Sequence, residues 1–404
     1  MTISSSESSI QDPPSSEVAI SARGVWKIFG SRAKQYGAAL DAGERIDPLN
    51  IRGTAAVVDA NFEIKKGETF VVMGLSGSGK STLLRTLNGL NPATAGQVHV
   101  NGQPVNGVSA EELRRIRRDE ISMVFQHFAL LPHKTVLQNV SYGLEIRGVS
   151  SKDRMEQAMT WIDRVDLHGN EYRYPDQLSG GMRQRVGLAR ALAAETDILL
   201  MDEAFSALDP VIRADLQQQL IELQAELGKT IVFITHDLNE AMKLGDRIAI
   251  MRSGEIVQLG TTSEILDTPA NDYVRRFIAD VDRSRVLTAG MVADRTPPVF
   301  APGDDASTIQ AELERTGHTA GVVLDGKRVV GAVDLLTVQN GTGTARDLVG
   351  PDKPVSRFNP IGDLFAKAAA NPEPLVVTNR DGTYVGLLAS DRMLDAMASQ
   401  GYHQ

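Results

Sequence analysis

Short, nearly continuous apolar runs alternate with longer helical patterns between Val18 and about Val281. This alternation predicts an α/β domain with a largely parallel sheet. The clearest buried strands are TFVVMG at 69–74, DILLMDE at 197–203 and TIVFITH at 230–236. Strands that are covered on both faces are apolar along their length, as these are. Each run ends in a glycine or a polar residue, at the edge of an open sheet where ligands bind.

The remaining segments have different patterns. A mostly helical stretch from about 105 to 177 predicts a helical subdomain inserted between sheet strands. A charged insert spans 31–53, and its pattern indicates no chemical role. After Asp282 a weak repeat relates the stretch at 321–338 to that at 374–394. Each copy is typical of a hairpin with a glycine-containing turn followed by a helix, so we expect the two copies to bury their faces against each other.

Composition indicates a globular protein of two or three domains. Hydrophobic residues make up 42% and charged residues 23% of the 404 residues, close to soluble averages. The formal charge of −9 argues against a nucleic-acid partner, because neutralising phosphates needs clustered Lys and Arg. The absence of cysteine excludes disulfides, thiolate metal sites and cysteine nucleophiles, and it fits a reducing compartment.

No segment has the pattern of a membrane span or a secretory signal. The apolar runs are shorter than the roughly 18 residues that cross a bilayer. The Ser-rich and Pro-rich start at 1–17 lacks a basic region and an apolar core, so it is typical of a disordered tail. Any role at a membrane must therefore come through a partner.

A complete phosphate-binding loop follows the first predicted strand. The stretch GLSGSGKST at 74–82 matches the P-loop pattern, with a strand before it and a helical pattern after it. Its glycines let backbone N–H groups close around phosphates at a helix N-terminus, where the dipole favours anions. Lys80 would reach the β- and γ-phosphates, and Ser81 would ligate Mg²⁺. The residues expected to bind the nucleotide here are Gly74, Ser76, Gly77, Ser78, Gly79, Lys80, Ser81 and Thr82.

Polar side chains end three other apolar runs. Asp202 and Glu203 end DILLMDE, where an aspartate can hold Mg²⁺ and the adjacent carboxylate can deprotonate an attacking water. His236 ends TIVFITH and could hydrogen-bond a γ-phosphate or the water, while Gln126 follows ISMVF and could contact Mg²⁺ or water. Solvated carboxylates and a structural histidine are the alternatives for these residues. The presence of the P-loop favours a common hydrolytic site.

A second glycine-rich loop lacks a P-loop lysine. The stretch LSGGMRQRVGLARALA at 178–193 has Ser179, Gly180 and Gly181 before a helical pattern from about Met182. These residues present N–H groups at a helix N-terminus. Such a loop can bind an exposed phosphate from outside, but it cannot easily enclose one.

Six motifs in this order resemble those of ABC ATPases. GLSGSGKST, FQ, LSGGMRQR, ILLMDE, SALD and ITHD match the Walker A, Q-loop, signature, Walker B, D-loop and H-switch motifs. The stretches MGLSGSGKSTLLRTLNGL, PDQLSGGMRQRVGLARALA and PANDYVRRFIADVD further resemble the ATPase subunit of glycine betaine/proline (quaternary amine) importers. That family carries an insert before the P-loop strand and a C-terminal pair of CBS repeats. This chain has candidates for both.

The resemblance implies a fold and a domain organisation. After the tail at 1–17, residues 18–281 would form an α/β nucleotide-binding domain with the P-loop NTPase ABC ATPase fold. The helical subdomain would span about 105–177, and a tandem CBS-like α/β regulatory domain would span 282–404.

The resemblance also implies that two copies of the chain meet head to tail with ATP between them. Glu203 would act as general base and His236 as γ-phosphate sensor, while Asp209 of SALD would lie at the dimer seam. Phe29 of WKIFG would stack on adenine, with Trp26 as the alternative and a core aromatic as the structural explanation. The predicted Mg²⁺ ligands are Ser81, Gln126 and Asp202, and those facing the partner copy's P-loop are Ser179, Gly180 and Gly181.

The expected partners follow from the same family. Two transmembrane permease subunits would hold the chain at the cytoplasmic face of the membrane, and a substrate-binding protein would deliver the cargo. The cargo would be glycine betaine, proline or a related quaternary amine, in osmoprotection. The alternatives are an importer of another cargo, such as an amino acid or polyamine, and a soluble ABC ATPase without transport.

The C-terminal repeat departs from CBS pairs that bind adenosine nucleotides. Such pairs usually carry Gly-h-h-(Ser/Thr)-x-x-Asp after the hairpin. In the first copy Asp334 stands at the hydroxyl position and Thr337 at the aspartate position, and in the second copy Ala389 and Arg392 stand there. From Arg283 onward 12 Lys and Arg stand against 14 Asp and Glu, a net of −2, so totals show no cationic face for anionic lipid.

Overall fold

The structure of the chain is a computed structural model. It describes residues 17–126, 128–206, 208–279, 281–350, 354–370, 373–379 and 381–398, so almost all of the predicted tail lies outside the described residues. The chain divides into two compact units, Met1–Thr261 and Thr262–Gln404. The predicted domain boundary after residue 281 stays a prediction.

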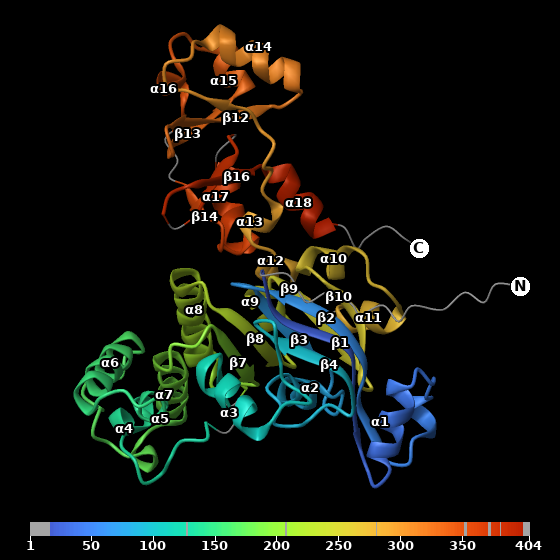
Figure 1. The fold of residues 1–404 in the computed structure, drawn as a ribbon. Coiled ribbons are helices and arrows are strands. Elements are labelled where there is room, and N and C mark those ends of the chain that lie inside the picture. Colours follow the sequence, from blue (N-terminus) through green and yellow to red (C-terminus); the bar gives the residue numbers. More distant parts are fainter. Residues whose placement is uncertain are drawn as a thin grey trace, which may run out of the picture. The chain divides into compact units, whose positions relative to one another are not determined.

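An antiparallel four-stranded sheet forms one layer of the first unit (Figure 1). Its order is β2-β1-β4-β5, with β1 Val18–Phe29, β2 Thr54–Lys65, β4 Ala95–Val100 and β5 Gln103–Pro104. The charged insert connects β1 to β2 and folds as helix α1, Ala33–Asp41, and the 3₁₀ helix η1, Pro48–Asn50.

A second sheet of six strands carries the predicted parallel strands. Its order is β10-β9-β3-β8-β7-β6, and only β10 runs antiparallel to its neighbour. The strands are β3 Thr69–Met73, β6 Ile121–Val124, β7 Ile198–Asp202, β8 Thr230–Thr235, β9 Arg247–Arg252 and β10 Glu255–Gly260. Every residue of β3, β7 and β8 is buried, which confirms that these apolar runs are covered on both faces.

The main core joins the two sheets through one helix. Helix α2, Lys80–Leu87, contributes Leu83, Leu84 and Leu87 to a cluster with buried residues of both sheets. The Phe62 and Phe70 rings stack within it, with centroids 5.1 Å apart. Three other helices of this unit are α3 Ala110–Asp119, α8 Pro210–Leu227 and α9 Leu238–Leu244. The start of α2 is thereby fixed at the end of β3.

A helical lobe follows β6 (green in Figure 1). It comprises α4 Val136–Val140, α5 Tyr142–Ile146, α6 Ser151–Arg164, the 3₁₀ helix η2 Pro175–Gln177 and α7 Gly180–Ala193. The predicted stretch 105–177 contains β6, a strand of the central sheet, so the lobe itself begins only at α4. Buried Asn139 shapes its entry by bonding the backbone of Leu131, Lys134 and Thr135.

The second unit begins with four short helices and continues with the predicted repeat. The helices are α10 Thr262–Asp267, α11 Asp272–Phe277, α12 Arg283–Val286 and α13 Ala289–Val292. The first copy contains β11 Val299–Phe300, α14 Ala306–Thr316, β12 Ala320–Asp325, β13 Arg328–Asp334, α15 Leu335–Asn340 and α16 Ala345–Leu348. The second contains β14 Val355–Ser356, η3 Ile361–Leu364, α17 Phe365–Ala370, β15 Leu375–Thr378, β16 Tyr384–Leu388 and α18 Ser390–Ala398.

The two copies have the same sheet topology and share a core. Each is a three-stranded sheet in which a short strand pairs in parallel with the first strand of the hairpin. Val322 and Ala332 of one copy cluster with Val376 and Leu387 of the other. This confirms the expectation that the repeats bury their faces against each other. Among the described residues of the whole chain, no helix combines the length and the apolar character that a bilayer crossing requires.

Leu200→Ala tests the buried parallel sheet. Leu200 is completely buried in β7, so we expect the truncation to lower the free energy of unfolding of the first unit by about 2–5 kcal/mol. Chemical denaturation followed by circular dichroism measures the effect. Leu90→Ala is the control, because Leu90 is 44% exposed and should change stability by less than about 0.5 kcal/mol. Equal effects of both variants would contradict the assigned burial.

Candidate functional site

Backbone crowding explains the glycines of the loop between β3 and α2. Gly74 has φ +150°, and a Cβ there would lie 2.3 Å from the Met251 carbonyl oxygen. Gly79 has φ +104°, and a Cβ there would lie 2.0 Å from the Ala56 carbonyl oxygen. Open space surrounds Gly77, where no atom lies within 4 Å of an added Cβ. The loop is therefore packed on its outer side and open where a phosphate would enter.

Lys80 begins α2 with its ammonium folded back on this loop. Its Nζ donates to the carbonyl oxygens of Gly74 and Leu75 at 2.9 and 3.1 Å. Burial lowers the pKa of Lys80 below its ordinary value, while the carboxylates of Glu203 and Asp202 act in the opposite direction. The Ser78 hydroxyl is also buried and has no hydrogen-bond partner within the protein. Both groups are suited to bind the oxygens of an entering anion.

Ser81 and Asp202 lie together, as the P-loop and strand-end motifs predict. The Ser81 hydroxyl donates to Asp202 Oδ1 at 2.8 Å, and Arg85 Nη2 lies 3.2 Å from Asp202 Oδ2. A hydroxyl and a carboxylate are the hard oxygen donors that Mg²⁺ prefers. The donor set at this point therefore fits a phosphate-bound magnesium ion.

Glu203 is the point at which the other predicted residues converge. Gln126 Nε2 donates to its Oε2 at 3.1 Å, and His236 Nδ1 lies 3.4 Å from the same oxygen. Lys80 Nζ lies 4.0 Å from its other oxygen. Glu203 itself has φ +46°, a left-handed conformation that is unfavourable for a side chain with a Cβ and is often found at functional sites. The ends of β3, β6, β7 and β8 thus bring their polar residues to one carboxylate.

Lys80, Gln126 and Glu203 line an open cavity of about 1210 Å³, whereas His236 and Asp202 are not among its lining residues. Four segments line it besides the P-loop: the ends of β6 and β7, the turn between β9 and β10 with its flanking residues, the insert between β1 and β2, and the start of β2. The residues outside the predicted set are Asp47, Pro48, Leu49, Ile51, Gly53, Thr54, Ala55, Ala56, Arg252, Ser253, Glu255 and Val257. The insert and the β9–β10 turn carry no motif, so sequence reasoning missed them.

The two candidate aromatic residues lie in different environments. Trp26 is buried in a small cluster with Ile28 and Val58, which assigns it to the core. Phe29 is 44% exposed, and the Lys27 ammonium lies 4.9 Å from its ring centroid. Phe29 is not among the described residues that line the cavity. Its role as the adenine-stacking residue stays a prediction.

The second glycine-rich loop lies at the start of α7 and does not line this cavity within one chain. Ser179 caps the helix, because its hydroxyl accepts the Met182 N–H at 3.2 Å. Gly180 and Gly181 form the first turn, two residues earlier than predicted, and Gly181 faces Ile212 of α8. Asp209 caps α8 and is exposed. One chain therefore presents the P-loop and the signature loop at separate places.

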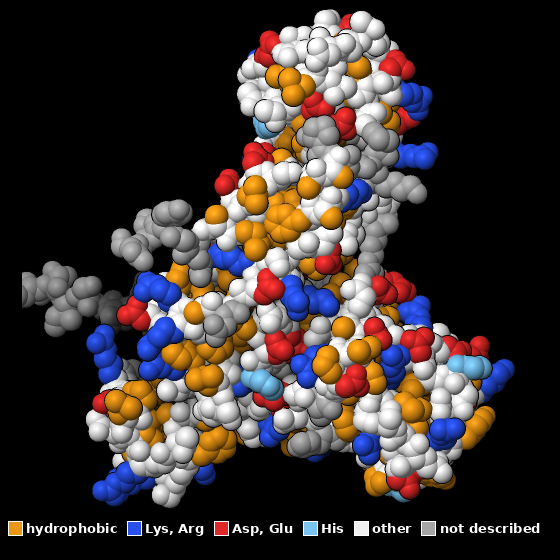
Figure 2. All heavy atoms as spheres, turned by 180° about the vertical axis from the view of Figure 1, so that it is seen from behind, with side chains coloured by type: hydrophobic (Ala, Val, Ile, Leu, Met, Phe, Trp, Pro, Cys, Tyr) orange, Lys and Arg blue, Asp and Glu red, His pale blue; other side chains and the backbone are white. Residues whose placement is uncertain are grey.

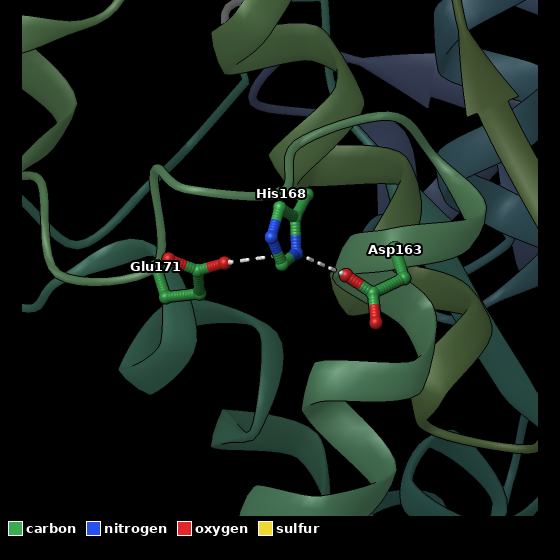
Figure 3. A group of neighbouring side chains, drawn as sticks. All are labelled: Asp163, His168 and Glu171. Carbon is green, nitrogen blue, oxygen red and sulfur yellow. Dashed lines mark hydrogen bonds and ion pairs between the residues drawn. The ribbon is translucent and has the colours of Figure 1, made fainter.

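Asp163, at the end of α6, and His168 and Glu171, in the loop after it, form another group of potential ligands (Figure 3). The His168 Nδ1 lies 3.1 Å from Asp163 Oδ1 and 3.7 Å from Glu171 Oε1. Glu171 Oε1 also accepts the Gly169 N–H at 2.7 Å. These contacts close the loop on itself, and His168 is 83% exposed. A structural role in the loop accounts for the cluster.

Comparisons with known proteins agree with this arrangement. The ABC transporter family model matches residues 57–206. The ATP-binding protein ProV of the glycine betaine/proline betaine transport system of Escherichia coli is 45% identical, over 94% of this chain and 97% of that protein. The glycine betaine/carnitine transport ATP-binding protein GbuA of Listeria monocytogenes is 43% identical, over 92% of this chain and 96% of that protein.

A solved structure of a dimeric ATP-binding cassette also resembles the first unit. It holds ADP and Pi in a post-hydrolysis state and is 34% identical, with a TM-score of 0.52. The match covers 60% of this chain and 98% of that cassette. The P-loop fold is therefore shared over a complete cassette.

A buried carboxyl group that contacts Thr235, the residue before His236 in the chain, provides a pH-dependent test. Glu240 in α9 is 7% exposed and accepts hydrogen bonds from the Thr235 hydroxyl and from Gln217 Nε2. Burial raises the pKa of Glu240 above its ordinary value, although these two hydrogen bonds lower it in part. Because the raised pKa belongs to the folded state, the neutral form favours folding, and this stabilisation is lost as pH rises through the folded pKa.

Glu240→Gln removes this titration and keeps the shape of the side chain. We expect the variant to gain stability relative to the parent protein as pH rises from about 5 to about 8. This range begins above the ordinary pKa of a glutamate and extends over raised carboxyl pKa values. Thermal unfolding of both proteins across this range measures the difference. Asp363→Asn, at an exposed position of η3, is the control. A difference between parent and variant that does not change with pH would refute the assignment.

Proposed function

The chain belongs to the family of ABC ATPases of glycine betaine/proline transport systems, and we propose that its two copies hydrolyse ATP to drive solute uptake. The observation that carries this proposal is the convergence of Lys80, Gln126 and His236 on Glu203 beside an open P-loop. A carboxylate in that position can accept a proton from a water that attacks the γ-phosphate.

Each residue of the cluster has a distinct task in this mechanism. Ser81 and Asp202 would hold Mg²⁺, which when bound offsets charge on the β- and γ-phosphate oxygens. Lys80 would exchange its bonds to loop carbonyls for bonds to phosphate. Glu203 would take the proton of the water, with Gln126 and His236 orienting the water and the γ-phosphate. The strained backbone of Glu203 would keep its carboxylate at this position.

A second copy of the chain would complete the site. Ser179 is exposed at the capped start of α7, where free N–H groups and the helix dipole favour an anion. It does not line the cavity of its own chain, so a head-to-tail partner would supply it to the γ-phosphate. Asp209, exposed at the start of α8, would lie at the seam. The dimeric state of the similar cassette supports this arrangement.

The transported solute would be glycine betaine, proline or a related quaternary amine. Support comes from the two relatives, which are named for glycine betaine with proline betaine or carnitine and match over 94% and 92% of this chain. A permease of two transmembrane subunits would hold the ATPase dimer at the cytoplasmic face of the membrane and transmit its closure. A substrate-binding protein would deliver the solute to that permease.

The second unit would be a CBS-like regulatory domain that does not use the usual ribose-binding pair. Asp334 caps α15 and accepts bonds from the backbone N–H and hydroxyl of Thr337 at 2.9 and 2.7 Å. In the second copy Arg392 pairs with Asp294 at 2.6 Å. Three of the four positions that would contact a ribose, Asp334, Thr337 and Arg392, therefore already have partners within the unit. This arrangement favours a regulatory signal other than adenosine nucleotide.

Glu203→Gln tests the general base. The amide cannot accept the proton of the attacking water, so we expect kcat to fall by about 10²–10⁴-fold. ATP and Mg²⁺ should then hold the variant as a stable dimer, because hydrolysis no longer opens it. Light scattering measures the dimer, and phosphate release measures kcat. Glu156→Gln, at an exposed position of α6, is the control. A variant that stays monomeric under these conditions would count against the shared site.

Ser179→Arg tests the contribution of the partner copy. The larger cationic side chain should block the start of α7 at the dimer interface, so we expect ATP turnover to be abolished. Binding of ATP to the single chain should remain within about twofold, because Ser179 does not line its own cavity. Ser151→Arg, at the exposed start of α6, is the matched control. Equal loss of binding and turnover would rule out the assignment.

A further inference from the structure

The insert between β1 and β2 forms one wall of the nucleotide cavity. Asp47, Pro48, Leu49 and Ile51 line it together with the P-loop. The other lining residues include the polar groups of the P-loop, Lys80, Gln126 and Glu203. The lining thus combines a phosphate-binding loop with apolar side chains, and the insert supplies Pro48, Leu49 and Ile51 to the apolar part.

A small core of its own holds this wall in place. Tyr36 and Leu40 of α1 and Ile51 pack against buried Trp26 and Ile28 of β1. The Tyr36 hydroxyl also accepts the Arg52 N–H at 2.9 Å.

The exit of the insert is equally constrained. Gly53 has φ +143°, and a Cβ there would lie 2.1 Å from the Phe29 carbonyl oxygen, so the chain passes β1 in direct contact. The wall is therefore preformed rather than a free loop.

Leu49 is the most exposed apolar side chain of this wall. It lies in η1, and 91% of its surface is accessible. Asp47 fixes the turn, because its two oxygens accept the Leu49 N–H at 2.9 Å and the Asn50 side-chain amide at 2.7 Å. Figure 2 shows hydrophobic side chains among Lys and Arg on the lobe that contains α1. A rigid turn that presents a leucine at the edge of a ligand cavity is suited to cover an apolar part of that ligand.

We propose that Leu49 and Ile51 contact the base of the bound nucleotide, so that the insert gives the site its affinity for a nucleoside phosphate over bare polyphosphate. This rests on the proposed function, because it assumes that the same cavity binds ATP. The proposal gives residues 31–53 a role. It is compatible with adenine stacking by Phe29, which is exposed at the end of β1. A leucine side chain has no hydrogen-bonding group. The contact therefore strengthens the binding of any nucleobase and discriminates little between one base and another.

The experiment compares ADP with inorganic tripolyphosphate as ligands of the full chain, both with Mg²⁺, by isothermal titration calorimetry. In Leu49→Ser the Kd for ADP should rise about five- to tenfold, as expected when a partly buried leucine contact is lost. The Kd for tripolyphosphate should stay within about twofold of the parent value, because the substitution leaves the P-loop residues unchanged. Leu49→Met should bind ADP like the parent protein, since it keeps an apolar side chain of similar volume.

Leu336→Ser is the matched control, because Leu336 is 69% exposed in the second unit and does not line the cavity. It should change neither Kd. An unchanged Kd for ADP in Leu49→Ser would overturn the proposal. If the same variant also lost ATP-driven dimerisation, Leu49 would instead belong to an interface with the second copy. Equal weakening of both ligands would also overturn it. A parent protein that binds neither ligand would instead refute the proposed function.

Discussion

The charge balance around one buried ammonium connects the parts of the site. Lys80 is almost completely buried, and a buried cation is stable only with partners that offset its lost hydration. Two loop carbonyls and the carboxylates of Glu203 and Asp202 provide that compensation. Each carboxylate in turn has further partners, Arg85 for Asp202 and His236 for Glu203. An entering triphosphate would compete with the carboxylates for the ammonium, which would couple ligand binding to the position of the Glu203 carboxylate.

Several close backbone contacts maintain this balance. Gly74 and Gly79 approach the carbonyl oxygens of Met251 and Ala56 so closely that neither position has room for a side chain. The turn between β9 and β10 therefore supports the P-loop, and the Gly254 N–H donates to the Ser78 carbonyl oxygen at 3.0 Å. Because β9 and β2 belong to different sheets, the shape of the P-loop depends on how these sheets pack around α2. Such close packing tolerates little displacement.

The second unit shows how two copies of a repeat can share a fold while their polar positions differ. Both copies retain the hairpin, the parallel edge strand and the shared apolar face. The polar positions after the hairpins are used for a helix cap in one copy and for an ion pair in the other. Apolar packing constrains the sheet faces in both copies, whereas the exposed helix starts can change without loss of the core.

The sequence by itself determined the α/β class, the buried strands and the polar residues at their ends, because local apolar runs and the P-loop spacing depend only on neighbouring residues. Tertiary structure alone decided that Gln126, His236 and Lys80 meet at Glu203, since this requires the parallel order of four strands. It also decided that β6 lies in the central sheet and that Trp26 is a core residue. Leu49 had no signal in the sequence, because an exposed leucine in a charged insert becomes informative only when the folded chain places it at the nucleotide cavity.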